Sequence, residues 1–414
     1  MTTRPSTVGT VEDPVCEPRR LRIMVCPHEL VTGGSQLIAI DLARRLRDRG
    51  HEVVVYGPGG TLVDRIHASG MTYRPAPPYR GDSVRPTVVR SFLRVLRQFR
   101  PDVVHTYESG PALALTVASL LAPVRHVATV GSMTVPDFIA DDVPLLPGTG
   151  QLVRAEERRR PGPVHLMPVT VDTALDAPRD VAAARERLGL GDGLVVSVVG
   201  RLSAEHGKAL GVASAIDALA TAGVDATFIV AGAGDDEHRV AAAARRATRS
   251  RLRVRLEGNV ADPGDIYAAA DVVLGMGSSA ARAMAYGKPV VVQGCRGFWR
   301  LLEASSAGLF EETGFFGDGP SGGPPLAELV RNLAADPEWR ARLGAYSRQL
   351  VLERYSATTA TNRLEALYLA EADRRAVRRP AAVARAVGRY ARFRLALAAP
   401  WLRRAVHRIT PRDA

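Results

Sequence analysis

A loop of small residues carries the clearest sign of chemistry in this sequence of 414 residues. Residues 272–274 are all apolar, as is typical of a parallel strand covered on both faces, and a helix is predicted after the loop. The loop itself consists of Gly275, Met276, Gly277, Ser278 and Ser279. Glycine lets a backbone approach a ligand closely, and a serine cap leaves the N–H groups of the helix facing outward. The loop predicts a phosphate site whose amides begin at Gly277, although an ordinary strand-to-helix turn fits the same residues.

A repeated strand–helix rhythm must position this loop. Apolar strands alternate with helices in the first half of the chain, and a second series of the same kind begins near residue 194. The predicted strands are residues 22–26, 53–56, 103–105, 126–130, 194–199, 227–230 and 272–274, with one more before the turn of Gly258 and Asn259 and another after Pro289. The predicted helices include residues 36–49, 87–99, 112–121, 326–334, 337–344 and 360–372. This rhythm predicts an α/β fold of parallel, doubly wound sheets, which bind ligands at the carboxyl ends of their strands.

Three motifs around the loop occur in an order that resembles a known family. Gly258, Asn259 and Val260 come first, residues 265–272 (DIYAAADV) follow, and residues 283–291 (AMAYGKPVV) close the series. This stretch resembles the C-terminal domain of family-four retaining glycosyltransferases of the actinobacterial type, and the likeness extends over about residues 22–370. The resemblance implies the GT-B fold, in which two Rossmann-like, doubly wound parallel-sheet domains face each other across a cleft.

The resemblance also divides the chain into domains. A crossover similar to the family's ends at Asp172, so residues 21–172 are expected to form the acceptor domain and residues 173–372 the nucleotide-sugar domain. Residues 1–20 are predicted to be disordered because they are polar and rich in proline and charge. Residues 137–161 are predicted to be irregular and to cover the rim of the cleft.

The same resemblance implies cations for a diphosphate. Arg201 stands at the family's phosphate-binding arginine, whereas the lysine that follows in the family is replaced by His206. Lys208 lies two positions later and is one of only two lysines, against 53 arginines. A compact ammonium suits a phosphate as a point charge, so Lys208 is expected to replace the missing lysine, with a solvated helix start as the alternative. The expected diphosphate site joins Arg201 and Lys208 to Gly277 and the two serines after it.

The nucleotide and its sugar are expected to contact a further set of residues, one of which departs from the family pattern. The set comprises Gly232, Gly234, Gly258, Asn259, Gly275, Met276 and Arg282. Arg282 stands where the family has a ribose-binding glutamate, and a guanidinium cannot accept a hydrogen bond from a ribose hydroxyl. Either Arg282 binds the diphosphate or a charged sugar, so that donor recognition is rewired, or the chain has lost catalysis.

Four residues of the first domain are expected on the acceptor side of the cleft. Gly33 and Gly34 precede a helix, like the family's N-terminal glycine loop, and His105 and Glu108 lie at the end of a strand. Ordinary packing explains the same residues as a tight turn and a strand-end histidine. Gly131 stands where many relatives have a histidine, which removes one group from the acceptor side. No residue is named as the catalytic base.

Composition limits the class of protein. Hydrophobic residues make up 46% of the chain and charged residues 24%, as in a soluble globular protein, and no apolar run is long enough to span a bilayer. Cys16, Cys26 and Cys295 are too few and too scattered for a disulfide framework or a metal site. The N-terminus lacks the apolar core of a signal peptide, so a cytoplasmic protein is expected.

Positive charge is concentrated near the C-terminus. The net charge is +12, and residues 371–414 carry twelve arginines against three acidic residues. The nearly neutral body argues against nucleic-acid binding. In the tail, residues 373–414, large apolar residues recur at helical steps beside arginines: Val383, Val387, Tyr390, Phe393, Leu397 and Trp401. Such a segment fits peripheral contact with an anionic membrane, and also a helix packed on the second domain with a solvated arginine face.

The expected function is that of a glycosyltransferase. It would move a hexosyl unit from a UDP-, GDP- or TDP-linked sugar to an unidentified acceptor, with retention. Members of this family stabilise the leaving diphosphate with cations and a helix N-terminus, so no metal ion or other cofactor is expected, and the chain has no Asp-x-Asp pair. Two other readings stay open: a catalytically inactive GT-B-like partner protein, and a membrane-surface adaptor anchored by the tail.

Overall fold

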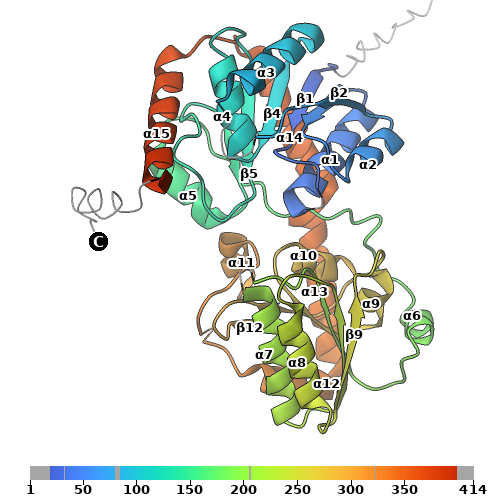
Figure 1. Ribbon diagram of the computed structural model, residues 1–414. Helices are drawn as coiled ribbons and strands as arrows, with labels where there is room; N and C mark the ends of the chain where they lie inside the picture. The colour runs from blue at the N-terminus through green and yellow to red at the C-terminus, as the bar shows by residue number, and fades with distance from the viewer. Residues whose placement is uncertain (1–18, 32, 80–83, 205–206, 321, 399–414) are drawn as a thin grey trace, which may run out of the picture.

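The computed structural model places the chain in two α/β domains, one at each end of the molecule (Figure 1). It describes residues 19–31, 33–79, 84–204, 207–320 and 322–398. The predicted disorder over residues 1–18, the substitution at His206 and the end of the tail from residue 399, with Trp401, lie outside the described residues. The predicted architecture of two Rossmann-like sheet domains is confirmed.

The N-terminal domain is built on a six-stranded sheet in which each neighbouring pair of strands is parallel. Its order is β3-β2-β1-β4-β5-β6, so the winding reverses between β1 and β4, where such sheets bind ligands. The strands are β1 (Arg22–Cys26), β2 (Glu52–Gly57), β3 (Thr72–Pro75), β4 (Val103–Tyr107), β5 (His126–Val130) and β6 (Leu145–Pro147). The helices between and after them are α1 (Gly34–Asp48), α2 (Val63–Ala68), α3 (Pro86–Phe99), α4 (Ser109–Ala118) and α5 (Gly150–Arg159).

The C-terminal domain repeats this design, with one difference at the edge of its sheet. The order is β12-β11-β10-β7-β8-β9, and β12 pairs antiparallel with β11, which departs from the predicted parallel sheet. The strands are β7 (Val195–Val199), β8 (Ala226–Ala231), β9 (Leu252–Gly258), β10 (Val272–Gly275), β11 (Val290–Gln293) and β12 (Trp299–Leu301). The helices are α6 (Val181–Arg187), α7 (Lys208–Thr221), α8 (Glu237–Ala247), α9 (Gly264–Ala269), α10 (Ser278–Ala285), α11 (Ala307–Thr313), α12 (Leu326–Ala335) and α13 (Pro337–Leu350).

Central strands form where the sequence is continuously apolar. β1 and β5 coincide with the predicted strands, and every residue of β5 and β10 is buried. The stretch of residues 137–161, predicted to be irregular, instead contains β6 and α5, which begins at the cap Thr149. β3 and β12 are absent from the predicted elements because these edge strands are short, and β3 is largely exposed.

The chain crosses back to the first domain near its end. After a π-helical turn, η2 (Val351–Tyr355), helix α14 (Ala357–Asp373) buries Leu364 and Tyr368 in the N-terminal core. The two crossings meet where Ala357 N donates to Val171 O at 2.8 Å. The expectation that residues 173–372 form one domain is therefore corrected, because the part from Ala357 onward belongs to the N-terminal domain.

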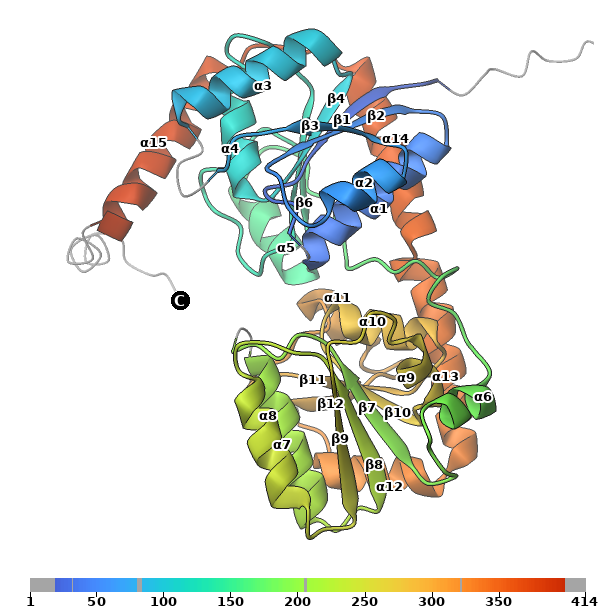
Figure 2. The same cartoon turned by 45° about the vertical axis from the view of Figure 1, so that its right-hand side comes forward.

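Helix α15 (Pro380–Ala398) also packs on the N-terminal domain, beside α4 (Figure 2). Tyr390 shares a buried apolar cluster with Leu113 and Phe138, and Arg385 Nη2 lies 3.0 Å from Asp141 Oδ1. The alternative prediction, a tail helix packed on the second domain, is therefore wrong, because the helix packs on the first domain instead. Within the described residues, no helix is both long and apolar enough to cross a membrane.

Candidate functional site

A cavity of about 630 Å³ lies between the two domains and takes its lining from both. The N-terminal domain contributes Tyr107 and Thr129, at the carboxyl ends of β4 and β5. The C-terminal domain contributes Val199 and Gln293, the last residues of β7 and β11. The carboxyl ends of both parallel sheets therefore meet at one place, which is the usual ligand site of doubly wound sheets.

The N-termini of helices converge on the same cavity. Gly34 opens α1, Lys208 opens α7 and Ser278 opens α10, and all three residues line the cavity. The first N–H groups of a helix, together with its macrodipole, create a partial positive charge. Arg201 adds a full positive charge to the lining from the loop after β7. The structure thus brings together Arg201, Lys208 and the start of α10, an arrangement that suits an anion such as a diphosphate.

Two glycines hold the loop that carries Arg201. Gly200 N donates to Ala231 O at 2.9 Å, and Leu202 N donates to Ala233 O at 3.0 Å. A Cβ on Gly232, whose φ is +150°, would lie 1.9 Å from Gly200 O, and one on Gly234 would lie 2.2 Å from Leu202 O. Neither glycine lines the cavity. Both shape the site through the backbone of the Arg201 loop, whereas the family resemblance implies that they contact the nucleotide.

The loop before α10 is held by its own hydrogen bonds. Ser279 Oγ accepts from Met276 N at 3.0 Å, and the N–H of Gly277, whose φ is +57°, donates to Phe315 O at 3.0 Å. A Cβ on Gly275 would lie 2.7 Å from the Cα of Ala280. Met276, Gly277 and both serines line the cavity. The expectation that the phosphate-binding amides begin at Gly277 is therefore corrected, because that N–H is already engaged.

Arg282 lies outside the lining of the cavity. Its Nε and Nη2 donate to the two carboxylate oxygens of Asp176 at 3.0 and 2.9 Å, and its guanidinium lies 5.8 Å from the ring centroid of Tyr267. This pair fastens the segment after the domain crossover to α10. Gly258 and Asn259 are also absent from the lining. Of the seven residues expected at the nucleotide, Met276 alone lines this cavity; the other six do not, namely Gly232, Gly234, Gly258, Asn259, Gly275 and Arg282.

His105 belongs to the core of the N-terminal domain. Its side chain is 0% exposed, Nδ1 shares a hydrogen bond with the hydroxyl of Tyr368, and Nε2 shares one with Thr129 Oγ1 at 2.7 Å. Burial, with a smaller effect of the nearby His126, lowers the pKa of His105 from its ordinary value to about 3. The ring is therefore neutral at neutral pH, and both nitrogens are occupied within the protein. His105 thus packs in the core, which is the alternative to the predicted acceptor-side role.

Glu108 is the acidic side chain of the first domain that reaches the cavity. Its carboxylate accepts from Gly131 N at 2.9 Å and from Ser132 Oγ at 3.2 Å. Its backbone has φ +70° and ψ 169°, a region that is almost restricted to glycine and costs about 1–3 kcal/mol for other residues. Such strain gathers at functional sites, where it aims a side chain that relaxed backbone would turn elsewhere.

Gly131 and Gly33 leave room for neighbouring side chains. A Cβ on Gly131 would lie 3.3 Å from Glu108 Oε1, so the glycine that replaces the family's histidine accommodates this carboxylate. A Cβ on Gly33 would lie 2.3 Å from Gln36 Oε1. The amide of Gln36 also donates from Nε2 to Glu29 Oε1 at 2.9 Å. Of the four residues expected on the acceptor side, Gly34 and Glu108 line the cavity.

Gln293 is a lining residue that the sequence analysis misses. Gln293 is only 3% exposed, and its side-chain oxygen Oε1 has no hydrogen-bond partner among the described residues. A buried amide oxygen without a partner costs stability, so a ligand that donates a hydrogen bond here would relieve that cost. The available signal is a polar residue directly after the apolar run of β11, at the carboxyl end of a central strand. Among the described residues, no three His, Cys, Asp or Glu side chains are grouped to hold a metal ion.

Two family models match regions that contain this site. The model described as Glycosyltransferase Family 4 matches residues 32–142, and that of Glycosyl transferases group 1 matches residues 193–320. Glu108 lies in the first region, and Arg201, Lys208 and the start of α10 lie in the second. Helices α14 and α15 lie beyond both regions.

Curated relatives share part of the chain. It is 29% identical over 197 residues to the α-D-kanosaminyltransferase of Streptomyces kanamyceticus, which covers 45% of this chain and 48% of that protein. It is 33% identical over 129 residues to the phosphatidyl-myo-inositol mannosyltransferase of Mycolicibacterium smegmatis, which covers 28% of this chain and 33% of that protein. The chain thus spans about half of the first relative's length and a third of the second's.

Solved structures are similar over most of the chain. A glycosyltransferase from Rickettsia africae has a TM-score of 0.69 and 14% identity, covering 85% of this chain and 99% of that one. Anabaena HepE in complex with UDP has a TM-score of 0.66 and 18% identity, covering 84% of this chain and 99% of that one. At these identities the likeness shows the fold. Together with the paired six-stranded sheets it establishes the GT-B fold, and the two family matches show that the chain belongs to the family-four glycosyltransferases.

Proposed function

We propose that the protein transfers a hexosyl unit from a nucleoside diphosphate sugar to an acceptor hydroxyl, with retention and without a metal ion. One observation carries the proposal: Arg201, Lys208 and the start of α10 line the same interdomain cavity as Glu108. The names of the two curated relatives support a hexosyl donor, and HepE, of similar fold, has been solved with UDP and with UDP-glucose. UDP-, GDP- and TDP-sugars are therefore the donors to test.

The transfer step places negative charge on the leaving diphosphate. The bond between the anomeric carbon and the diphosphate oxygen breaks, the acceptor oxygen bonds to that carbon from the same face, and the acceptor proton passes to the leaving phosphate oxygen. Arg201, Lys208 and the partial positive charge at α10 stabilise the diphosphate as its charge grows, because they are already in place before the reaction. Glu108 accepts a hydrogen bond from the acceptor and so orients its hydroxyl.

The reading as an inactive partner protein rests on Arg282 and His206. Arg282 pairs with Asp176 and is absent from the cavity lining, so this charge reversal leaves the cavity open. His206 lies outside the described residues. This observation favours the transferase over the inactive partner.

Thermal-shift measurements with UDP-, GDP- and TDP-sugars test the proposal. At least one donor should raise the melting temperature of the full chain, and Arg201→Ala should abolish that rise because it removes the charge beside the diphosphate. Arg246→Ala is the matched control, since Arg246 pairs with Asp217 away from the cavity. Absence of a shift with every donor, or a shift that persists unchanged in Arg201→Ala, would refute the proposed donor site.

We also propose that the end of α15 contacts anionic membranes. Leu395 and Leu397 are 61% and 49% exposed, and they lie beside Arg392 and Arg394. Exposed leucines and arginines on one helix end suit the boundary of an anionic bilayer, where each arginine contributes about 1 kcal/mol. The full chain should sediment with phosphatidylserine vesicles and not with neutral vesicles, and Leu395→Asp with Leu397→Asp should abolish sedimentation. Equal sedimentation of this double variant would contradict the proposal.

A further inference from the structure

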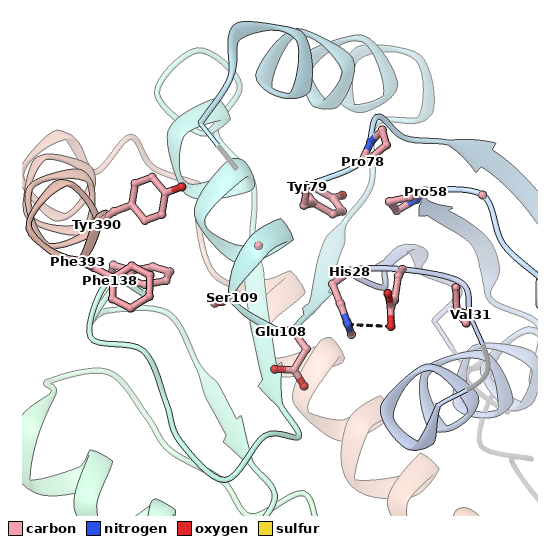
Figure 3. A pocket seen from close by; sticks show the side chains of 13 residues that line it. His28, Val31, Pro58, Pro78, Tyr79, Glu108, Ser109, Phe138, Tyr390 and Phe393 are labelled. Carbon is pink, nitrogen blue, oxygen red and sulfur yellow. Dashed lines mark ion pairs between the residues drawn. The ribbon is translucent and has the colours of Figure 1, made fainter. Parts of the chain in front are cut away.

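A second hollow, of about 550 Å³, lies in the N-terminal domain and shares His28 and Glu108 with the interdomain cavity. Figure 3 shows Phe138, Tyr390 and Phe393 on one side, His28 and Val31 on the other, and Glu108 and Ser109 between them. The strained backbone of Glu108 thus places its carboxylate where the two spaces meet. A molecule in the second hollow would reach the proposed site of transfer past this carboxylate.

Helix α15 builds the aromatic side of this hollow. Tyr390 and Phe393 come from α15, and the ring centroids of Phe138 lie 5.2 and 5.3 Å from theirs. Tyr390 is buried and holds the helix on the domain, whereas Phe393 is 43% exposed. Helix α15 lies beyond both regions matched by the family models, whereas Phe138 lies inside the first of them.

The charge of the hollow is unusual for this protein. Its lining holds the carboxylates of Glu29 and Glu108, and among the described lining residues there is neither an arginine nor a lysine. The whole chain, by contrast, carries 55 basic residues against 43 acidic ones. Glu29 Oε1 lies 3.5 Å from Nε2 of the lining His28, whereas Glu108 has no basic side chain beside it among the described lining residues. The two carboxylates therefore disfavour a phosphate group, and they accept hydrogen bonds from hydroxyl or amino groups.

We propose that this hollow binds the acceptor, and that the acceptor is a ring-shaped polyol, neutral or amine-bearing, without a phosphate group. Its ring stacks against Phe393 and Tyr390, and one of its hydroxyl groups donates to Glu108. Phe393 is then a residue that determines acceptor specificity. This inference rests on the proposed transferase function, since it assigns that function's second substrate.

Direct binding tests the inference without turnover. The probes are methyl α-D-glucoside, methyl α-D-glucosaminide and myo-inositol, each compared with its monophosphate by saturation-transfer NMR on the full chain. At least one unphosphorylated probe should bind, and its monophosphate should bind about tenfold more weakly because of the two carboxylates. Tighter or equal binding of the monophosphates, or no binding of any probe, would overturn the inference.

Variants of Phe393 locate the binding. Phe393→Ala should weaken the bound probe about fivefold or more, and Phe393→Tyr should restore it because the ring is kept. Leu352→Ala is the matched control, since Leu352 is also 43% exposed but lies in the C-terminal domain, away from the hollow. If Phe393→Ala binds the probe like Leu352→Ala, the inference is wrong. The donor-induced thermal shift is measured in parallel. If the unaltered chain shows no shift with any donor, the proposed function is wrong. If Phe393→Ala keeps both the shift and the probe binding, this inference alone is wrong.

Discussion

Arg282 and Asp176 form a two-pronged ion pair, with Nε to Oδ2 at 3.0 Å and Nη2 to Oδ1 at 2.9 Å. Tyr286 donates from its hydroxyl to the same carboxylate at 3.4 Å. The charge reversal at position 282 is therefore matched by an acidic residue 106 positions earlier in the chain. The pair ties the segment after the domain crossover to α10, and so indirectly supports the loop in front of that helix.

Replacement of Arg282 by alanine should lower stability without removing the donor. The carboxylate of Asp176, which is mostly buried, would lose both hydrogen bonds from the Arg282 guanidinium. The free energy of unfolding should therefore fall by about 2 kcal/mol. Urea denaturation measures this loss. Arg246→Ala is the control: Arg246 forms an exposed ion pair with Asp217, so its removal should change the free energy of unfolding by less than about 1 kcal/mol. Loss of the donor-induced thermal shift in Arg282→Ala, with unchanged stability, would instead place Arg282 at the donor.

Gly232→Ala should damage the donor site through the backbone. The new Cβ would clash with Gly200 O, 1.9 Å away, and the loop that carries Arg201 would have to move. Gly189→Ala separates this clash from the cost of a positive φ, since Gly189 has φ +62° and nothing within 4 Å of the position of its Cβ. Gly189→Ala should cost about 1 kcal/mol and keep donor binding, whereas Gly232→Ala should cost more and lose it. Thermal melting with and without donor measures both effects; similar behaviour of the two variants would contradict the role of Gly232.

The strained backbone of Glu108 should lower the stability of the protein, while its carboxylate supports sugar transfer. Glycine adopts φ +70° without strain and alanine does not, so Glu108→Gly should be more stable than Glu108→Ala by about 1 kcal/mol. Both variants should lose sugar transfer, because the carboxylate that orients the acceptor is gone. Urea denaturation of the pair measures the strain, and an alanine variant as stable as the glycine variant would show that none is stored at this residue.

Stability should fall in acid through two buried histidines. Burial lowers the pKa of both His105 and His126 to about 3, against an ordinary value of about 6.5. Between these values the unfolded chain binds more protons than the folded chain, so the contribution of each histidine is complete above pH 6.5 and is lost as the pH falls toward 3. Each histidine should add about 1.4 kcal/mol per pH unit to the slope at pH 4–5.

His105→Gln should remove part of that slope. Urea denaturation at pH 7, 6 and 5 compares it with the unaltered chain, and His67→Gln, on the exposed side of α2, should keep the original slope. An unchanged slope in His105→Gln would mean that this histidine takes up its proton in the folded state as readily as in the unfolded one.

The strands show how far the sequence alone reaches. Residues 22–26 and 126–130 match β1 and β5 because a continuous apolar run depends only on neighbours in the chain. The largely exposed β3 and the arginine-rich α5 carry no such run, and their formation depends on the domain that they pack against. The sequence places Arg201 in the turn after a strand and Lys208 and residues 277–279 near the starts of helices, and the structure brings all of them to one cavity.

His105 and Glu108 mark the limit of that reasoning. Both follow the same apolar strand, three residues apart, and the sequence treats them alike. A backbone turned to φ +70° sends Glu108 into the cavity, while Tyr368, from a helix more than 260 residues away, holds His105 in the core. The sequence by itself determined the order of the central strands and of the helices between them, because that order follows from local apolar periodicity. Only the tertiary structure decided which polar side chains face the cavity, because their partners come from distant parts of the chain.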